Sequence, residues 1–278
     1  MTLNLELVKK IIKESLLEDI GSGDITSNLT IDADSNTAFS IRAREELVVC
    51  GTNIAKMVFA ELNKDIRIYD NFSEGDVIEP GEIILSGYGN SRAIFAAERV
   101  ALNLLRVTCG TASITRKFVE QIAATKAQIL DTRKTIPLLR EIQKYAVRIG
   151  GGKNHRLRLD DAILIKDNHI KASGSVSNAI TKALFAKEKV KFIEVECDNL
   201  KQVAECLNYN IDIIMLDNMS IEEINEAVAM VKGKVKLEVS GNVNLDNVLE
   251  IANSGVDYIA IGMITHSTPN VDIGLDID

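Results

Sequence analysis

No stretch of this 278-residue sequence is apolar for long enough to cross a membrane. The longest apolar stretches, such as Ile211–Leu216 with its internal Asp212, fall well short of the roughly 18–20 residues that a spanning helix needs. Residues Met1–Leu17 form a charged amphipathic pattern that lacks the uninterrupted apolar segment of a signal peptide. We therefore expect no membrane span and a cytoplasmic location.

Cysteine and proline are both scarce. The four cysteines, at positions 50, 109, 197 and 206, form no C-x-x-C pair and have no histidine at metal-ligand spacing, which argues against a cysteine zinc site and favours reduced thiols. With 3 prolines and 17 glycines in a chain that is 46% hydrophobic and 26% charged, the composition is that of an ordinary globular protein. Disordered and fibrous classes are excluded.

Positive charge is in deficit over the whole chain but concentrated in one window. The net charge of −8 argues against a general nucleic-acid binder, because phosphate contacts need a surplus of Lys and Arg. Residues 131–171, however, carry ten basic and five acidic side chains, a net charge of +5, so the rest of the chain carries −13. A local basic patch in an acidic protein predicts a site for small anionic ligands.

The pattern of apolar residues predicts two domains. In the first half, helical patterns at 6–17 and 91–106 accompany strand patterns at 38–50, 66–69 and 76–88. From about residue 127 onward, short β-branched runs alternate with amphipathic stretches, which indicates parallel strands with crossover helices. The six expected strands span 127–131, 162–165, 192–195, 211–216, 236–239 and 258–261.

Polar and charged residues follow every one of these six strands, and this favours a barrel over an open sheet. In a (β/α) barrel all strand C-termini open onto one face, so six separate segments can converge on one pocket, whereas an open sheet gathers mainly those near its switch point. Because six strands are visible where eight are standard, we expect an incomplete barrel. The run 271–277 could add a strand back to the first domain.

Cations and carboxylates are expected to meet in that pocket. Arg133 and Lys134 come directly after a strand, Lys166 follows the next, and His155 and Arg156 follow three glycines whose backbone N–H groups can approach an anion closely. Glu194 and Glu196 share one side of their strand, and Asp217 ends another. Cations facing carboxylates suit the transfer of a sugar phosphate. Two structural alternatives remain: each acid, taken singly, could cap the end of its strand, and the basic window could be a solvent-exposed helix face.

Nine segments, in order along nearly the whole chain, resemble the quinolinate phosphoribosyltransferase family. They are Glu18–Thr26, Glu98–Leu105, Asp131–Thr135, Lys144–Val147, Gly150–Arg156, Leu164–His169, Glu194–Glu196, Leu216–Met219 and Thr265–Ser267. The resemblance implies an α/β fold in which an N-terminal α/β sandwich domain (residues 1–110, with 268–278 returning to it) joins an incomplete (β/α) barrel with fewer than eight strands (residues 111–267). The barrel would carry the catalytic site.

The resemblance also implies a reaction and its residues. Quinolinate and phosphoribosyl pyrophosphate would react, with Mg²⁺, to give nicotinate mononucleotide, pyrophosphate and CO₂ in de novo NAD biosynthesis. The protein would work as a homodimer with shared active sites, alone or as an assembly of dimers. The quinolinate carboxylates would be held by Arg99 of the neighbouring subunit and by Arg133, His155, Arg156 and Lys166. Lys134, Glu196 and Asp217 would bind the phosphoribosyl group, Glu196 and Asp217 also the metal, and Ser240, Gly241, Gly262 and His266 would hold the 5-phosphate.

Departures from the family pattern leave these charged residues in place. Asn242 stands where the family commonly has glycine, as does Leu138. Two other functions remain open at this point: a related phosphoribosyltransferase-like protein associated with molybdate-transport genes, and a non-catalytic barrel that only binds anions.

Overall fold

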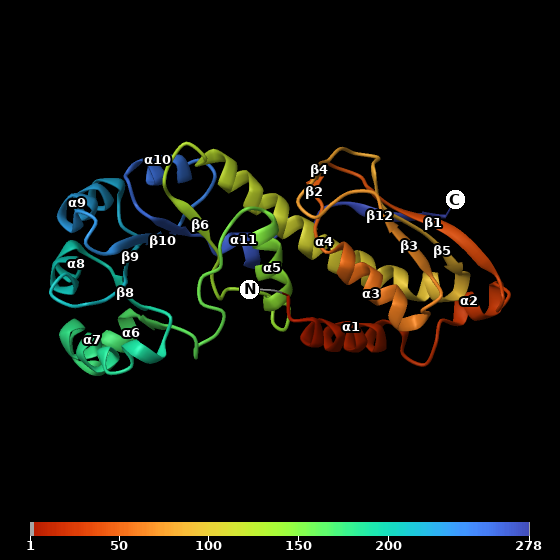
Figure 1. Cartoon of the computed structure of the whole chain (residues 1–278), viewed down its shortest axis with the longest axis horizontal. Helices are drawn as coiled ribbons and strands as arrows, with labels where there is room; N and C mark the ends of the chain where they lie inside the picture. Colours follow the sequence, from red (N-terminus) through yellow and green to blue (C-terminus); the bar gives the residue numbers. More distant parts are fainter. Residues whose placement is uncertain (1–2, 278) are drawn as a thin grey trace. The chain divides into compact units, whose positions relative to one another are not determined.

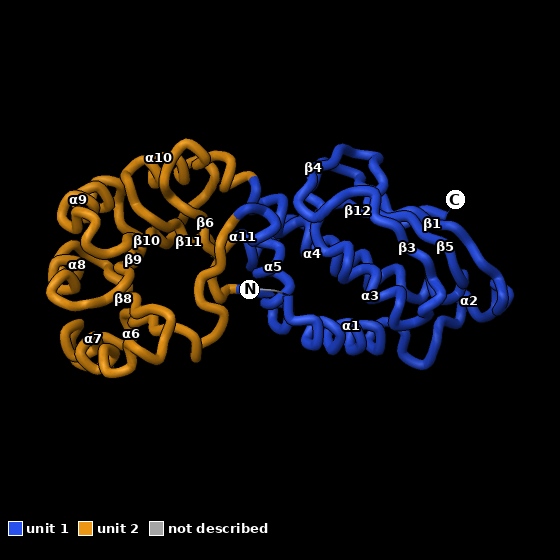
Figure 2. Tube along the Cα trace, viewed as in Figure 1, with its two compact units in different colours: residues 1–116, 135–151, 264–278 blue, residues 117–134, 152–263 orange. Residues whose placement is uncertain are grey.

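The computed structural model describes residues 3–277 and divides into two compact units (Figure 2). Unit 1 contains residues up to 116, residues 135–151 and residues from 264 onward; unit 2 contains residues 117–134 and 152–263. Residues 1, 2 and 278, which we assigned to the sandwich domain, lie outside the described residues. The segment 135–151 groups with unit 1 although we assigned it to the barrel domain, because Ile142 and Ala146 pack into the unit 1 core. The boundary at residue 110 stays a prediction.

The main sheet of unit 1 is antiparallel and has the strand order β12-β1-β5-β3. Its strands are β1 (Asn36–Ala43), β3 (Arg67–Asp70), β5 (Ile83–Asn90) and β12 (Ile273–Ile277). Ile41 of β1 lies opposite Leu275 of β12, so the end of the chain returns as expected from its sequence. The short strands β2 (Leu47–Val48) and β4 (Val77–Ile78) form a separate pair.

Helices supply the rest of the unit 1 core. They are α1 (Leu5–Ile20), α2 (Ile25–Thr30), α3 (Thr52–Leu62), α4 (Ser91–Gln121), α5 (Arg140–Ile149) and α11 (Met263–His266). The rings of Phe39 in β1 and Phe59 in α3 are both fully buried, with centroids 5.1 Å apart. The last five residues of α4 belong to unit 2, as does Met263 at the start of α11.

Unit 2 contains a parallel six-stranded sheet of the order β6-β11-β10-β9-β8-β7. Its strands are β6 (Gln128–Leu130), β7 (Ile163–Ile165), β8 (Ile193–Cys197), β9 (Ile213–Asp217), β10 (Lys236–Ser240) and β11 (Tyr258–Ala260). From β7 to β11 the strands follow the order of the chain, and the first strand, β6, lies beside the last, as in a barrel. Among the described residues β6 and β7 are not paired with each other; an isolated parallel bridge instead joins Leu130 of β6 to Lys153, in the segment between the two strands. The predicted incomplete barrel with fewer than eight strands is therefore confirmed.

Crossover helices lie outside these strands (Figure 1). They are α6 (Asp167–Ser173), α7 (Val176–Leu184), the 3₁₀ turn Lys187–Lys189, α8 (Leu200–Cys206), α9 (Ile221–Val231) and α10 (Val248–Asn253). All five residues of β8 are buried, two of them glutamates. Helices cover the outer face of β8, and the side chains of Glu194 and Glu196 lie on its inner face. The inner face of the sheet is therefore polar.

Among the described helices, none combines the length and the hydrophobicity that a membrane span requires.

All four cysteines are buried and form no disulfide. Burial raises the pKa of the Cys109 thiol to about 12, which makes that thiol unreactive.

Candidate active site

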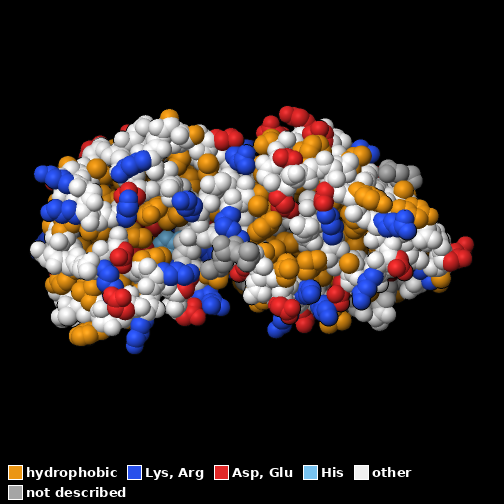
Figure 3. All heavy atoms as spheres, viewed as in Figure 1, with side chains coloured by type: hydrophobic (Ala, Val, Ile, Leu, Met, Phe, Trp, Pro, Cys, Tyr) orange, Lys and Arg blue, Asp and Glu red, His pale blue; other side chains and the backbone are white. Residues whose placement is uncertain are grey.

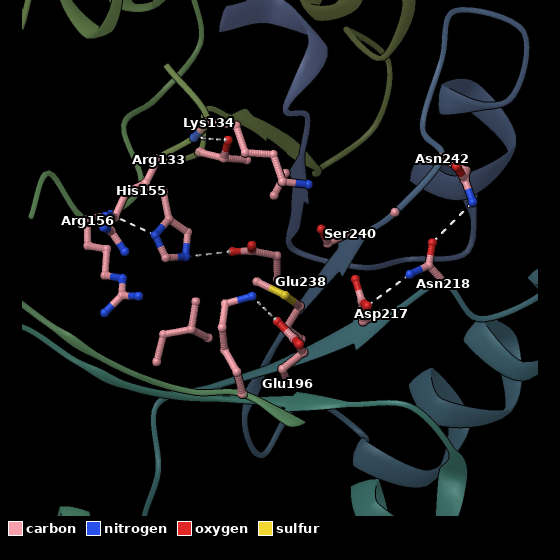
Figure 4. A pocket seen from close by; sticks show the side chains of 16 residues that line it. Arg133, Lys134, His155, Arg156, Glu196, Asp217, Asn218, Glu238, Ser240 and Asn242 are labelled. Carbon is pink, nitrogen blue, oxygen red and sulfur yellow. Dashed lines mark hydrogen bonds and ion pairs between the residues drawn. The ribbon is translucent and has the colours of Figure 1, made fainter. Parts of the chain in front are cut away.

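One pocket of about 510 Å³ opens among the C-terminal ends of the unit 2 strands (Figure 4). Nine of the twelve site residues predicted from the sequence line it: Arg133, Lys134, His155, Arg156, Lys166, Glu196, Asp217, Ser240 and Gly241. In the space-filling view a histidine side chain is visible in a hollow of this unit, with Lys and Arg side chains nearby (Figure 3). The structure thus brings these residues together, while their individual roles stay predictions.

Strand register arranges the pocket in rows. Glu238 of β10 and Glu196 of β8 both lie level with Met215 of β9. Asp217 and Ser240 lie one row nearer the strand ends, since side chains two residues apart point to the same face. Carboxylates therefore occupy the floor and one wall of the pocket.

Two arginines supply the opposing charge. Arg156 is only 7% exposed and donates from Nη1 to the carbonyl oxygen of Ala162 at 3.1 Å. Burial and, second, the positive charge of Arg133 lower the pKa of Arg156. Two like charges held this close in a partly buried pocket favour a bound anion, because a carboxylate or phosphate would relieve their repulsion.

The loop that carries His155 and Arg156 is clamped by a buried acid. Asp131, fully buried at the end of β6, accepts hydrogen bonds from the Asn154 amide Nδ2 at 2.6 Å and from the His155 backbone N–H at 2.9 Å. The backbone N–H of Arg156 in turn donates to Nδ1 of His155 at 2.7 Å. These bonds fix a segment that has no regular secondary structure.

His155 sits above two buried glutamates. Its Nε2 is 2.7 Å from Oε2 of Glu194 and 3.7 Å from Oε2 of Glu238, and both glutamates have 0% exposure. Both ring nitrogens of His155 therefore already contact protein groups. Glu238 was not selected from the sequence. Its position two residues before Ser240 places both side chains on the same face of β10, and this spacing could have indicated it.

Lys166 and the remaining carboxylates form the other wall. Nζ of Lys166 lies 2.6 Å from Oε2 of Glu196. Burial and, second, the negative charge of Glu196 raise the pKa of Asp217. Two carboxylates that repel each other are a donor set that suits a divalent cation such as Mg²⁺.

The turn after β10 presents backbone groups to the pocket. Gly241 has φ +96° and Asn242 has φ +51°, and a succession of such conformations forms an anion-binding concavity of N–H groups. The Asn242 amide Nδ2 donates to Oδ1 of Asn218 at 3.1 Å. Asn at position 242 thus adopts the conformation that glycine would, and its side chain supports the turn.

Three predicted residues are not among the described residues that line this pocket: Arg99, Gly262 and His266. Arg99 is exposed on α4 in unit 1, 3.4 Å from Glu98. His266 is exposed at the end of α11 in unit 1, where its Nδ1 lies 2.7 Å from Oγ of Ser267. Gly262 follows β11 in unit 2.

Comparison with known proteins identifies the family. The family model described as quinolinate phosphoribosyl transferase, N-terminal domain, matches residues 24–109, and that of the C-terminal domain matches residues 111–276. The chain belongs to the quinolinate phosphoribosyltransferase family. The pocket described above lies within the C-terminal domain of that family.

Relatives in this family are similar over nearly their full length. A probable nicotinate-nucleotide pyrophosphorylase (carboxylating) of Methanocaldococcus jannaschii is 44% identical, with 96% of each chain covered. The corresponding Bacillus subtilis protein is 37% identical, with 97% of this chain and 93% of the relative covered. The solved structure of nicotinate-nucleotide pyrophosphorylase from Ehrlichia chaffeensis is 45% identical and superposes with a TM-score of 0.93, covering 100% of both chains.

Proposed function

We propose that this chain transfers the phosphoribosyl group of phosphoribosyl pyrophosphate to quinolinate. The products would be nicotinate mononucleotide, pyrophosphate and CO₂, in a step of de novo NAD biosynthesis. The observation that carries the proposal is that three cations, Arg133, Arg156 and Lys166, line the same pocket as the carboxylates of Glu196 and Asp217. A substrate with two carboxylates needs the cations, and a sugar that develops positive charge needs the acids.

Binding would order the dicarboxylate so that its ring nitrogen faces C1 of the ribose. Arg133 and Arg156 would receive the carboxylates with their planar, multiply donating guanidinium groups, and Lys166 would add a point charge. Arg99 of a second subunit would complete the set. Since His155 already contacts Glu194 and the Arg156 N–H, its contribution to quinolinate binding is proposed from the family resemblance.

Transfer would proceed by breaking the bond between C1 and pyrophosphate. The carboxylates of Glu196 and Asp217 would stabilise the positive charge that develops on the ribose ring. The same two residues would hold Mg²⁺, whose charge, with that of Lys134, neutralises the departing pyrophosphate. Ser240 and Gly241, with Gly262 and His266, would anchor the 5-phosphate. Once its nitrogen is alkylated, the pyridinium ring stabilises the electron pair left when the 2-carboxylate departs as CO₂, and no covalent enzyme intermediate is required.

A CO₂-release assay tests this function. We expect the purified chain to release CO₂ from carboxyl-labelled quinolinate only when phosphoribosyl pyrophosphate and Mg²⁺ are present. Arg133→Ala should lower kcat/KM by roughly 10–100-fold, because a hydrogen bond to a charged group contributes about 1.5–3 kcal/mol. The exposed Arg158, which pairs with Asp160 and does not line the pocket, provides the matched control Arg158→Ala.

Two results of the assay would contradict the proposal. If pyrophosphate appears without quinolinate-dependent CO₂ release, the chain acts on an acceptor other than quinolinate. If ligands bind but neither product forms, the barrel is an anion-binding module. Unmutated kcat/KM in Arg133→Ala would remove that residue from the site.

We also propose a homodimer in which each site is shared, or an assembly of such dimers. The proposal rests on the family resemblance, which assigns Arg99 of unit 1 to the neighbouring subunit's quinolinate. The four unpaired cysteines suit the reducing cytoplasm in which we propose the enzyme works.

A further inference from the structure

Decarboxylation requires a proton that none of the proposed substrate-binding residues supplies. When the C2–carboxylate bond breaks, CO₂ departs and the electron pair stays on C2 of the alkylated ring. A proton must then form the C2–H bond of the product, so each turnover consumes one proton inside the pocket. This argument depends on the proposed function.

Three carboxyl groups line the described pocket, and two of them are engaged. Glu196 is hydrogen-bonded to the Lys166 ammonium at 2.6 Å, and Asp217 accepts from the Asn218 amide at 2.9 Å. Glu238 differs from both. It has 0% exposure, no hydrogen-bond donor among the described residues lies within bonding distance of its oxygens, and its nearest basic group is Nε2 of His155, at 3.7 Å.

The charges that act most strongly on Glu238 are negative, those of Glu194 and Asp131. Glu194, from β8, is equally buried and gives one oxygen to Nε2 of His155, at 2.7 Å. Nδ1 of His155 accepts the Arg156 N–H, so the ring keeps its proton on Nε2, facing Glu194. Asp131, at the end of β6, adds a third acid. Two carboxylates beside one histidine can retain one proton between them.

The hydrogen bond of 2.7 Å from Nε2 of His155 favours the ionised form of Glu194, so the shared proton falls to Glu238, which lies 3.7 Å from the same nitrogen. Burial and, second, the negative charge of Glu194 raise the pKa of Glu238 well above its ordinary value. Glu238 points toward His155 from the floor of the pocket (Figure 4), and a carboxyl group kept neutral in this way can act as a proton donor at neutral pH.

We propose that Glu238 is the acid that protonates C2 after CO₂ leaves. The O–H bond of the Glu238 carboxyl breaks, the C2–H bond forms with the electron pair of the carbanion, and Glu238 is left as a carboxylate. After product departs, the proton returns from solvent by way of His155, whose side chain is 7% exposed and whose Nε2 lies 3.7 Å from Oε2 of Glu238. Glu194 is the positioning residue that holds His155 and keeps Glu238 neutral.

Single-turnover measurements on the full chain test this assignment. Glu238→Gln keeps the shape and neutrality of the carboxylic acid but has no proton to transfer. Without the acid the carbanion at C2 recaptures the CO₂ held in the pocket, so we expect net CO₂ release to slow by roughly 100-fold or more, the scale of general acid catalysis. Pyrophosphate should still form within about threefold of the unmutated rate. The doubly carboxylated nucleotide should then accumulate. Glu250→Gln, on the exposed side of α10, is the control.

Two further variants separate chemistry from structure. Glu238→Asp retains an acidic proton and should release CO₂ faster than Glu238→Gln, even where both are less stable. Glu194→Gln removes a charge that keeps Glu238 protonated and releases His155, so it should slow CO₂ release less than Glu238→Gln does and also raise the KM for quinolinate. Normal CO₂ release in Glu238→Gln, or equal losses of pyrophosphate and CO₂ in Glu238→Gln and Glu194→Gln, would overturn the assignment. Failure of the unmutated chain to form either product would instead overturn the proposed function.

Discussion

The side chain of Asn218, the residue after β9, supports the turn that follows β10. Asn218, itself at φ +53°, receives the Asn242 amide on its Oδ1. A Cβ atom at Gly241 would lie 2.1 Å from that oxygen and 3.0 Å from the Asn218 backbone nitrogen. Only a residue without a side chain fits here, and the backbone N–H groups of the turn remain open to an anion.

We therefore predict that Gly241→Ala weakens phosphate binding. The clash with Asn218, added to about 1–2 kcal/mol of left-handed strain, should raise the KM for phosphoribosyl pyrophosphate at least about tenfold and that for quinolinate much less. Gly255→Ala is the matched control, because Gly255 has φ +93° but only Val228 nearby, at 3.8 Å. Equal effects of both substitutions on both substrates would mean that strain alone is responsible.

At the scale of helices and strands, β-branched runs located the strands of unit 2 more reliably than periodic apolar residues located the helices. All six strands of unit 2 were predicted, because buried parallel strands consist of short apolar runs. Helix α5 was missed although Ile142, Ala146 and Ile149 recur at helical spacing, because its basic residues were considered only as part of the positively charged window. Glu238 was missed for a different reason: a glutamate within a strand normally indicates an exposed face, and its burial depends on residues more than 40 positions away.

In helix α4, helix propensity does not explain the glycine at position 110. Gly110 lies in the interior of this 31-residue helix, where glycine costs about 1 kcal/mol relative to alanine. A Cβ atom there would meet the Pro269 carbonyl oxygen at 2.1 Å and the Thr268 methyl group at 3.0 Å. The close approach of residues 268–269 to the helix, both within unit 1, requires glycine.

Gly110→Ala is accordingly predicted to destabilise the protein despite its better helix propensity. Overpacking of this kind costs about 1–3 kcal/mol, so the urea midpoint should fall. Asn103→Ala, at an exposed position of the same helix, should leave the midpoint unchanged or slightly higher. A midpoint that rises in Gly110→Ala would show that residues 268–269 can move away without cost.

At the scale of the whole molecule, the proposed sharing of sites makes two inactive variants complementary. Arg99→Ala and Lys166→Ala should each be inactive alone. When they are mixed in equal amounts, dissociated and reassociated, half of the dimers would be mixed and each would contain one intact site of two. About a quarter of the unmutated activity is therefore expected from two-fold symmetry.

The control for this experiment is the same mixture without dissociation, which should stay inactive. Subunit exchange is verified by mass with one isotopically labelled variant. If verified exchange restores no activity, Arg99 serves the barrel of its own chain.

Unit 1 is built from three separate segments of the chain, and this arrangement affects how the protein folds. The chain passes between the units four times, at residues 116, 134, 151 and 263, and β1 pairs with β12 more than 200 positions later. Contacts so distant in sequence slow folding, because a long loop must close before they stabilise anything. Until residues 273–277 leave the ribosome, one edge of the sandwich sheet stays open to pairing with other chains. During synthesis, therefore, the first domain to emerge is the last to be finished, and its nascent form is the species that chaperones would need to shield.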